Sequence, residues 1–184
     1  AIAPIYARAK FKVKQTKNVV YAKAIKRTSW NAKTGQQVDL KLDIFEPEGY
    51  THPKKPVLVV IHGGGFKNGS KEHNALVTLA KQFAARGWVS FSINYSLEKD
   101  FGPIPAGWPA IARRLYPAGR DAKAAIRWLR ANATTYRIHP DYISAMGGSA
   151  GAGLAIALGL SFENDYKKDT LSLDPTLKRT NPTQ

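Results

Sequence analysis

The pentapeptide Gly147-Gly148-Ser149-Ala150-Gly151 joins two segments of contrasting pattern. Residues 142–146 before it are typical of a short strand, and the small and aliphatic residues of 150–160 are typical of a helix. A sharp turn from strand to helix brings the positions two before and two after its apex so close that side chains there would collide, so both need to be glycine. The pentapeptide therefore predicts such a turn, with Ser149 held in strained backbone angles.

Upstream of this turn, the chain alternates between predicted strands and helices. Residues 57–61 are a continuous aliphatic run, as in a strand that is buried on both faces. The segments that follow are predicted as a helix over 73–86, a strand over 89–93, a helix over 117–132, a strand over 142–146 and a helix over 150–160. This order predicts an α/β fold, a parallel sheet with helices on both faces.

The first part of the chain is predicted as a basic arm over residues 1–17, and residues 18–184 are assigned to one domain. Antiparallel strands are expected over 18–28 and 37–45, joined by a hairpin-like link over 31–35. In the second strand, apolar residues alternate with Asp39, Lys41 and Asp43, so one face is expected to be buried and the other solvated. The hairpin makes the predicted sheet mixed, although mostly parallel.

Basic residues outnumber acidic ones, and the formal net charge is +15. Residues 1–55 contribute +8 of this charge, with twelve lysines and arginines against four acidic residues. Such a surface either keeps a protein soluble or binds an acidic partner. No nucleic-acid-binding motif accompanies the charge, so no nucleic acid partner is expected.

Other classes of protein are excluded by composition. The chain contains no cysteine, which rules out disulfides and cysteine-built zinc sites, and no metal site is predicted. The apolar stretch over 150–160 is about half as long as a membrane-spanning helix, so no membrane span is expected. The start Ala1-Ile2-Ala3-Pro4 is either what remains after removal of a signal peptide or an arbitrary boundary, and we interpret it as favouring a secreted protein.

The predicted turn around Ser149 is suited to nucleophilic chemistry. A helix that begins directly after the serine directs its first N–H groups and the positive end of its dipole at the hydroxyl. The N–H of Ala150 would then bind the oxyanion that forms when Ser149 attacks a carbonyl group. The alternative is a Gly/Ser turn that only begins a helix, but the flanking strand and helix fit the catalytic form of the motif.

A second glycine-rich segment, His62-Gly63-Gly64-Gly65, directly follows the first buried strand. Three consecutive glycines let the backbone approach a ligand and turn its N–H groups inward. Such a loop forms one wall of an oxyanion hole. The alternative is a phosphate-binding loop, which would need a Gly-Lys-Ser/Thr or G-x-G-x-x-G pattern that is absent here.

With these two motifs in this order, the chain resembles an α/β-hydrolase serine esterase or lipase, in the group of acetyl esterases, carboxylesterases and hormone-sensitive-lipase-like enzymes. The resemblance spans about residues 36–160 and includes Asn94-Tyr95, Asp121, Arg127-Trp128-Leu129 and His139-Pro140-Asp141. It implies that Ser149 is the nucleophile and that Ala150, with two of Gly63, Gly64 and Gly65, donates to the oxyanion. Structural roles are expected for His62, Tyr95, Asp121 and His139, with Tyr95 beneath the glycine loop.

The rest of a catalytic triad is missing from the sequence. In this fold the triad runs in the order Ser, Asp or Glu, His. All four histidines precede Ser149, namely His52, His62, His73 and His139. The carboxylates that follow Ser149 lie just after the last predicted helix and are not assigned to the triad: Asp165, Asp169 and Asp174. A sheet that stopped at the strand before Ser149 would also leave an exposed apolar edge.

We therefore expect the C-terminal half of the fold to be carried by a second polypeptide, separated by cleavage in the loop around 180–184, or by a missing segment. The predicted function is hydrolysis of small or aryl acyl esters through an acyl-enzyme on Ser149, without a cofactor. Residues 101–108 either wall the substrate pocket or form a surface loop around a buried tryptophan. The alternative function is a non-catalytic binding or structural protein that reuses the hydrolase fold and offers its basic surface to acidic partners.

Overall fold

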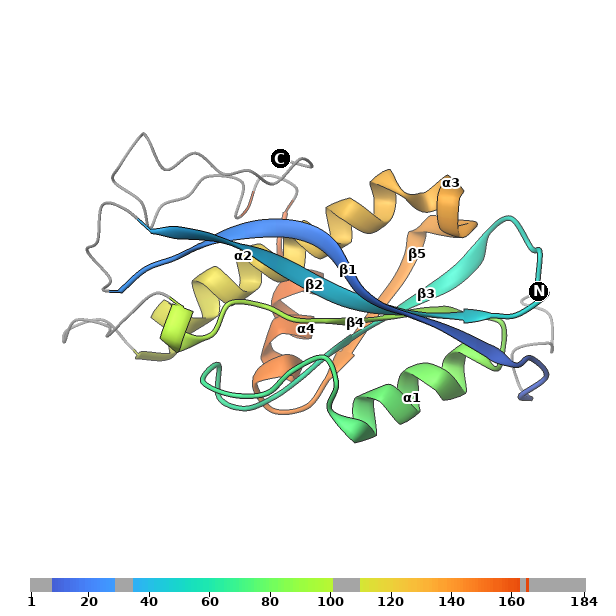
Figure 1. The fold of residues 1–184 in the computed structure, drawn as a ribbon, viewed down its shortest axis with the longest axis horizontal. Coiled ribbons are helices and arrows are strands. Elements are labelled where there is room, and N and C mark those ends of the chain that lie inside the picture. Colours follow the sequence, from blue (N-terminus) through green and yellow to red (C-terminus); the bar gives the residue numbers. More distant parts are fainter. Residues whose placement is uncertain (1–7, 29–34, 101–109, 163–164, 166–184) are drawn as a thin grey trace.

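The computed structural model of the chain describes residues 8–28, 35–100, 110–162 and 165. The described elements run along the chain as strands β1 (Val13–Lys26), β2 (Gln36–Pro47) and β3 (Lys55–Ile61), helix α1 (Asn74–Ala84), strand β4 (Val89–Ile93), the 3-10 helix η2 (Glu98–Asp100), helices α2 (Ala110–Ala131) and α3 (Ala133–Tyr136), strand β5 (Ile138–Gly147) and helix α4 (Ala150–Leu160). Figure 1 shows them as a sheet with helices packed along it.

The strands form one mixed sheet in the order β1-β2-β4-β3-β5, as the sequence predicted. The long hairpin of β1 and β2 is antiparallel, and β2 continues antiparallel to β4. Strand β3 lies between β4 and β5 and is parallel to both. The two parallel pairings direct the carboxyl ends of β3, β4 and β5 to the same edge of the sheet.

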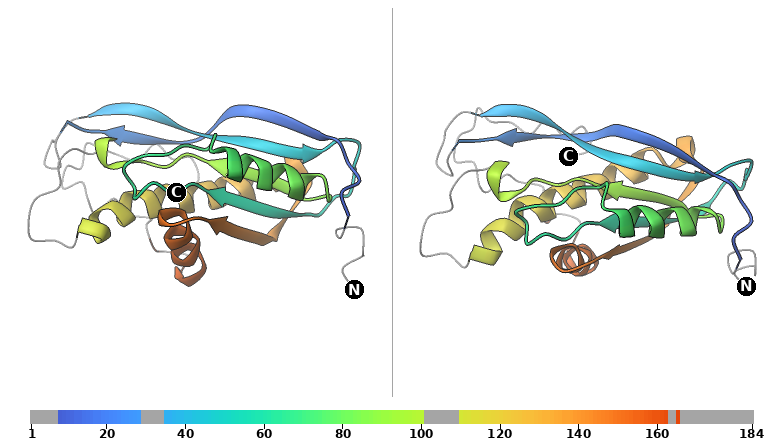
Figure 2. Two further views of the ribbon diagram at one scale, coloured as in Figure 1. Left: turned by 90° about the horizontal axis from the view of Figure 1, so that it is seen from below. Right: turned by 60° about the horizontal axis from the view of Figure 1, so that its bottom comes forward.

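Helices cover both faces of the sheet, which confirms the predicted layers (Figure 2). Along β3 successive side chains point to opposite faces. Val57, Val59 and Ile61 pack in one core with α2 and α4, whereas Leu58 and Val60 pack in a second core with α1. All seven residues of β3 except Pro56 are buried, as expected for a strand between two helical layers.

Strand β1 begins at Val13, so the predicted arm over 1–17 is too long by five residues. The cause is a bulge at Asn18, whose φ is +60° and near which the pairing with β2 shifts register between Thr16 and Val19. A bulge interrupts the alternation of side chains, so the pattern before it no longer continues the pattern after it. Residues 13–16 nevertheless pair with β2 in the same ladder.

Helix α2 and strand β5 both begin earlier in the chain than the sequence predicted, and a proline is the reason in each case. Proline favours the first turn of a helix, so a start at Pro117 was expected, yet α2 begins at Ala110 and contains Pro117. In β5, Pro140 suggested a turn because proline lacks the N–H of a ladder, yet the strand begins at Ile138. The pairing with β3 shifts register beside Pro140, between Lys55 and Val57, which accommodates it.

Several predictions fall outside the described residues. They concern most of the hairpin link at 31–35, the loop at 101–108, the carboxylates Asp169 and Asp174, and the C-terminal segment.

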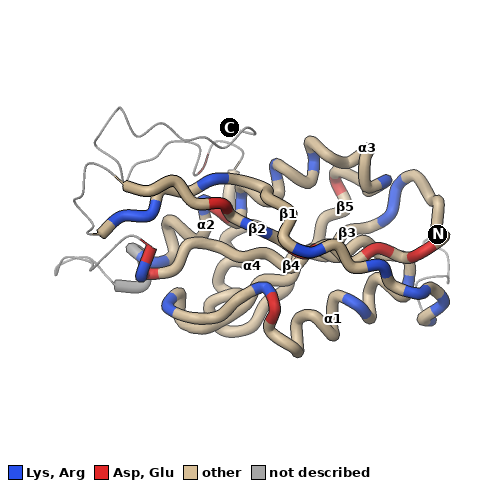
Figure 3. Tube along the Cα trace, viewed as in Figure 1, with Lys and Arg blue, Asp and Glu red and all other residues tan. Residues whose placement is uncertain are grey.

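Basic residues are spread along the described trace and do not gather at one place (Figure 3). Acidic residues lie among them, and some exposed pairs form, such as Lys23 with Asp39 at 3.7 Å. In the described ranges, no helix is both long and apolar enough to span a bilayer.

The side of the sheet that ends in β5 carries exposed apolar residues. Within the described part of the chain, β5 pairs with β3 alone. Tyr142 on β5 is 67% exposed, and on the neighbouring helix α4 the exposed fractions are 63% for Ile156 and 77% for Leu160. Large apolar side chains at an open strand edge are costly in water and are normally covered.

Candidate functional site

The two glycine-rich segments meet at one edge of the sheet. Strand β3 ends at Ile61 and β5 ends at Gly147, and these two residues are paired in the parallel ladder. The loops that follow the two strands therefore leave the sheet side by side. A Cβ atom added to Gly63 would lie 2.8 Å from the carbonyl oxygen of Gly148, so the backbones of the two loops are in close contact.

Glycine is required on both sides of Ser149 because a side chain at either position would collide with backbone atoms. A Cβ atom at Gly147 would lie 2.5 Å from the carbonyl oxygen of Ile61, and a Cβ atom at Gly151 would collide with the same oxygen. Real Cβ atoms essentially never lie within 3.0 Å of a heavy atom from outside their own and the two adjacent residues. The collision across the turn that the sequence predicted is confirmed, since a Cβ atom at Gly147 would also lie 2.5 Å from the carbonyl carbon of Gly151. The Ile61 carbonyl of β3 is a second obstacle that both positions share.

Ser149 lies at the apex of the turn with φ +51° and ψ −117°. Such backbone angles cost a non-glycine residue about 1–3 kcal/mol and are kept only where the surroundings enforce them. The residue is exposed, and its hydroxyl does not cap the helix that it precedes. A serine at the start of a helix usually accepts a hydrogen bond from a backbone N–H of the first turn, and this turn holds the hydroxyl away from that position.

Helix α4 begins at Ala150 and directs its amino end at the turn. The N–H of Gly151 donates to the carbonyl of Gly148 at 2.9 Å. The N–H of Ala150 donates to no acceptor in the described part of the chain, as is usual for the first turn of a helix. An unpaired N–H beside the positive end of a helix dipole can stabilise a negative charge next to Ser149.

The glycine loop adds further backbone donors. Gly64 and Gly65 have φ values of +105° and +62°, which turn the peptide planes in a way that most residues cannot adopt. Among the hydrogen bonds of the described residues, none uses the N–H groups of Gly63, Gly64 or Gly65. The carbonyl of Gly64 accepts from the N–H groups of Lys67 and Asn68, which closes the loop into a tight turn.

His62 supports this loop from below. The ring is 1% exposed, and its Nδ1 lies 2.8 Å from the Gly63 carbonyl, so Nδ1 carries the proton in that hydrogen bond. It stacks on Tyr95 at a centroid distance of 4.3 Å, and the Tyr95 hydroxyl donates to the His62 carbonyl at 2.8 Å. Burial lowers the pKa of His62 and raises the pKa of Tyr95, so both rings are neutral at pH 7.

The structure gives the remaining candidates partners outside the Ser149 turn. Asp121 is buried and accepts from the Ser96 N–H at 2.9 Å, so it ties α2 to the segment after β4. His139, expected in a turn, lies in β5 and stacks on Tyr142 at 4.1 Å. Within the described residues, the Ser149 hydroxyl bonds to no histidine, and His, Asp and Glu form no cluster suited to a metal ion.

Sequence reasoning missed a polar cluster behind the glycine loop. Asp43 was expected on the solvated face of its strand, yet it is fully buried and lies 2.8 Å from the ammonium group of Lys71. Lys71 is itself 3% exposed, although it lies in a polar, turn-like segment. The alternation of side chains assigned Asp43 to the correct face of its strand, the one expected to be solvated. That face is buried instead because the chain after the glycine loop crosses it, a path that the alternation cannot predict.

A model of the BD-FAE family matches residues 42–182 of the chain. Esterase LipQ of Mycobacterium tuberculosis is 36% identical over 121 residues, which are 65% of this chain and 26% of that protein. Esterase LipC of the same bacterium is 31% identical over 120 residues, which are 65% of this chain and 27% of that protein.

Among solved structures, native esterase 2 of Thermogutta terrifontis matches with a TM-score of 0.58 and 27% identity, over 89% of this chain and 50% of that one. The likeness confirms the predicted α/β-hydrolase fold. The chain spans about a quarter of the length of these curated relatives and half of the solved esterase.

Replacing two glycines of α4 separates the steric demand of the turn from helix propensity. Gly151→Ala is expected to lower the free energy of unfolding by about 1–3 kcal/mol or more, because the added methyl group collides with the Ile61 carbonyl. Gly153→Ala meets no atom within 4 Å and is expected to raise stability by up to about 1 kcal/mol. Urea denaturation of both variants measures the difference, and equal effects would contradict the proposed collision.

The buried His62 predicts a loss of stability in mild acid. Burial lowers its pKa below the ordinary 6.5, so between these two values the unfolded chain binds a proton that the folded chain excludes. The free energy of unfolding is therefore expected to fall as the pH drops from 7 through about 6.5 and below, until the folded-state pKa is passed. His62→Asn should flatten this slope, and His52→Asn, which changes an exposed histidine, is the matched control. Parallel slopes for His62→Asn and the unsubstituted protein would refute the assignment.

Proposed function

Because the chain belongs to the BD-FAE family, we propose that it supplies the nucleophile and the oxyanion-binding groups of a carboxylic-ester hydrolase. The observation that carries this proposal is the position of Ser149, exposed on a strained turn between the amino end of α4 and the glycine loop. The mycobacterial relatives named esterases support the same class of reaction.

In the proposed reaction, Ser149 Oγ attacks the carbonyl carbon of an ester and loses its proton to a general base. The carbonyl oxygen becomes an oxyanion, which accepts hydrogen bonds from the Ala150 N–H and from two of the N–H groups of Gly63, Gly64 and Gly65. Collapse of the tetrahedral intermediate expels the alcohol, protonated by the conjugate acid of the base, and leaves the acyl group on Ser149. Water then attacks the acyl carbon and loses a proton to the base. Collapse of the second tetrahedral intermediate breaks the bond to Ser149 Oγ, which takes the proton back, and releases the carboxylic acid. No metal or organic cofactor takes part.

The base and its orienting carboxylate are proposed to come from polypeptide beyond these 184 residues. No histidine follows Ser149, and the ring of His62 is buried with Nδ1 already bonded to the Gly63 carbonyl. The open edge of β5 and the exposed apolar residues of α4 are where further strands and helices would pack. The relatives support this arrangement, since this chain covers half or less of each.

Small acyl esters are the proposed substrates, with aryl acyl esters as an extension. Solved forms of the Thermogutta terrifontis esterase are described as propionate-bound and butyrate-bound, and another as phosphorylated by paraoxon. Carboxylate products of three and four carbons therefore guide the choice of test substrate for this protein.

Ser149→Ala is expected to reduce the hydrolysis of p-nitrophenyl butyrate by at least about a thousandfold, because the acyl-enzyme cannot form. Protein purified from its native source is the sample, so that any further polypeptide is present. A fluorophosphonate probe should label Ser149 in the unsubstituted protein, as peptide mapping will show, and should not label the variant. A folded sample with neither labelling nor hydrolysis would favour a non-catalytic protein instead.

The 184 residues alone are expected to fold with an exposed apolar edge and to hydrolyse esters only at the background rate, since no base is present. Mass spectrometry and denaturing gels of the native-source protein, from cells and culture medium, should show these residues either in a longer chain or beside a co-purifying second polypeptide. The medium fraction also tests the proposed secretion. An active, monomeric species of 20.2 kDa would overturn this part of the proposal.

A further inference from the structure

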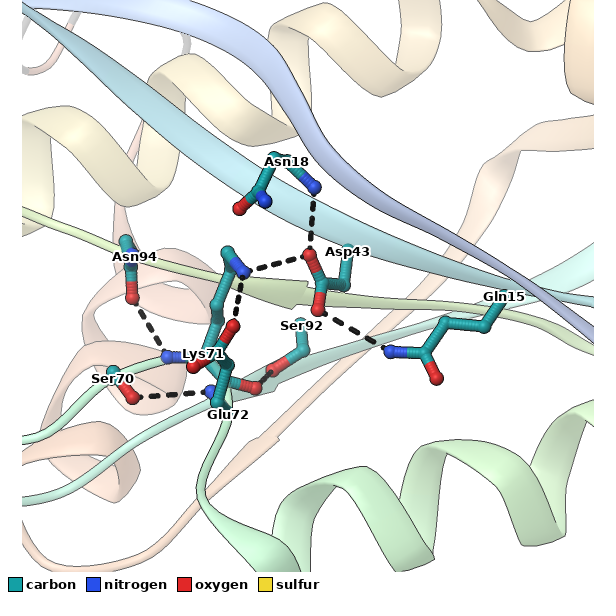
Figure 4. Close-up of polar contacts among 8 residues, drawn as sticks. All are labelled: Gln15, Asn18, Asp43, Ser70, Lys71, Glu72, Ser92 and Asn94. Atoms are coloured by element: carbon teal, nitrogen blue, oxygen red, sulfur yellow. Dashed lines mark hydrogen bonds and ion pairs between the residues drawn. The ribbon is translucent and has the colours of Figure 1, made fainter.

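Lys71 is bonded in three directions behind the glycine loop. Its ammonium group lies 2.8 Å from Asp43 Oδ1, its backbone N–H donates to Asn94 Oδ1 at 2.7 Å, and its carbonyl accepts from Ser92 Oγ at 2.7 Å. Figure 4 shows Lys71 with Asn94 on one side and with Asp43 and Ser92 on the other. The lysine is thereby attached, by side chain and backbone, to two adjacent strands of the sheet.

The carboxylate of Asp43 is itself held by strand β1. Its Oδ1 accepts from the backbone N–H of Asn18 at 2.9 Å, and its Oδ2 lies 3.4 Å from Gln15 Nε2 (Figure 4). The bulge at Asn18, with φ +60°, turns that N–H toward Asp43. These two contacts hold the carboxylate in the position at which it meets Lys71.

The segment held by Lys71 lies directly against the glycine loop. A Cβ atom at Gly69 would lie 2.5 Å from His62 Nδ1 and 2.7 Å from the Gly63 carbonyl oxygen, so the backbone of Gly69 supports both residues. Gly69 precedes Lys71 by two residues. We therefore expect that movement of Lys71 away from the sheet would shift the backbone that packs against Gly63.

We infer that Lys71 is a positioning residue for the oxyanion-binding glycine loop, and that its pair with Asp43 fixes that loop for catalysis. The inference rests on the proposed function of Ser149. A buried ion pair does not by itself indicate a stabilising role, because apolar side chains of similar volume often stabilise a fold equally well. Its value here is geometric, since misplacement of a donor by about 1 Å can lower a rate by about a hundredfold.

Two conservative substitutions on β4 test whether the support of Lys71 affects catalysis. Ser92→Ala removes the hydroxyl that bonds the Lys71 carbonyl, whereas Ser90→Ala removes a buried hydroxyl that has no hydrogen-bond partner in the described residues. With p-nitrophenyl butyrate and native-length protein, Ser92→Ala is expected to lower kcat about threefold to tenfold with KM within about twofold, as loss of support in the transition state requires. Ser90→Ala should leave both constants unchanged. Equal kcat for the two variants would overturn the inference.

A second set separates positioning from stability. Lys71→Met leaves Asp43 buried without its cation and should lower both thermal stability and kcat, the latter by about tenfold or more. Adding Asp43→Asn removes that charge and keeps an acceptor for the Asn18 N–H, so stability should largely return while kcat stays low. Lys23→Met, which breaks an exposed pair, is the control.

Recovery of kcat together with stability in the double variant would show a structural role only and would overturn the inference. An unsubstituted protein that neither hydrolyses the ester nor reacts with the fluorophosphonate probe would instead refute the proposed function, and this inference with it. The two failures are distinguished by the unsubstituted protein alone.

Discussion

The carbonyl oxygen of Ile61 occupies the space that a side chain at position 147 or 151 would need. This contact joins the end of β3 to the turn between β5 and α4, and the rest of the site depends on it. Because both glycines accept the close approach, the turn can tighten until Ser149 reaches φ +51° and its hydroxyl faces solvent. The same approach places the loop after β3 directly beside the turn after β5, so that Gly63 lies against Gly148.

A strained turn persists only on a rigid support, and the sheet supplies it. Strands β3 and β4 are buried on both faces between α1 and the pair α2 and α4. The cost of the Ser149 conformation, about 1–3 kcal/mol, is small beside the burial of two such strands. The groups presented to a ligand are mostly backbone N–H groups, whose positions follow from the path of the chain. Their precision therefore depends on the residues that hold the loops, of which His62, Tyr95 and Lys71 are the buried examples.

Sequence patterns predicted the elements best where a single signal was uninterrupted. The run Val89–Ile93 and the small residues of Ala150–Leu160 gave the bounds that the structure has. Prediction failed where one residue carried a local preference that tertiary packing overrode. Pro117 suggested a helix start but lies inside α2, whose earlier turns are joined to η2 by the Arg114–Glu98 ion pair at 3.1 Å. At Asn18 a bulge hid the continuity of β1, because one extra residue reverses the alternation on which the pattern depends.

The sequence by itself determined the local chemistry of the site. The requirement for glycine around Ser149 and the three glycines that follow β3 are matters of residues close together in the chain, and the 184 residues hold no histidine after Ser149. Only the tertiary structure decided which distant residues support that chemistry. Asp43 and Lys71 are 28 residues apart, and nothing near either one marks it as buried. They meet because the order β2-β4-β3 brings the segment after β3 back across β4 to the face of β2, and such a path depends on strand pairing across the whole sheet.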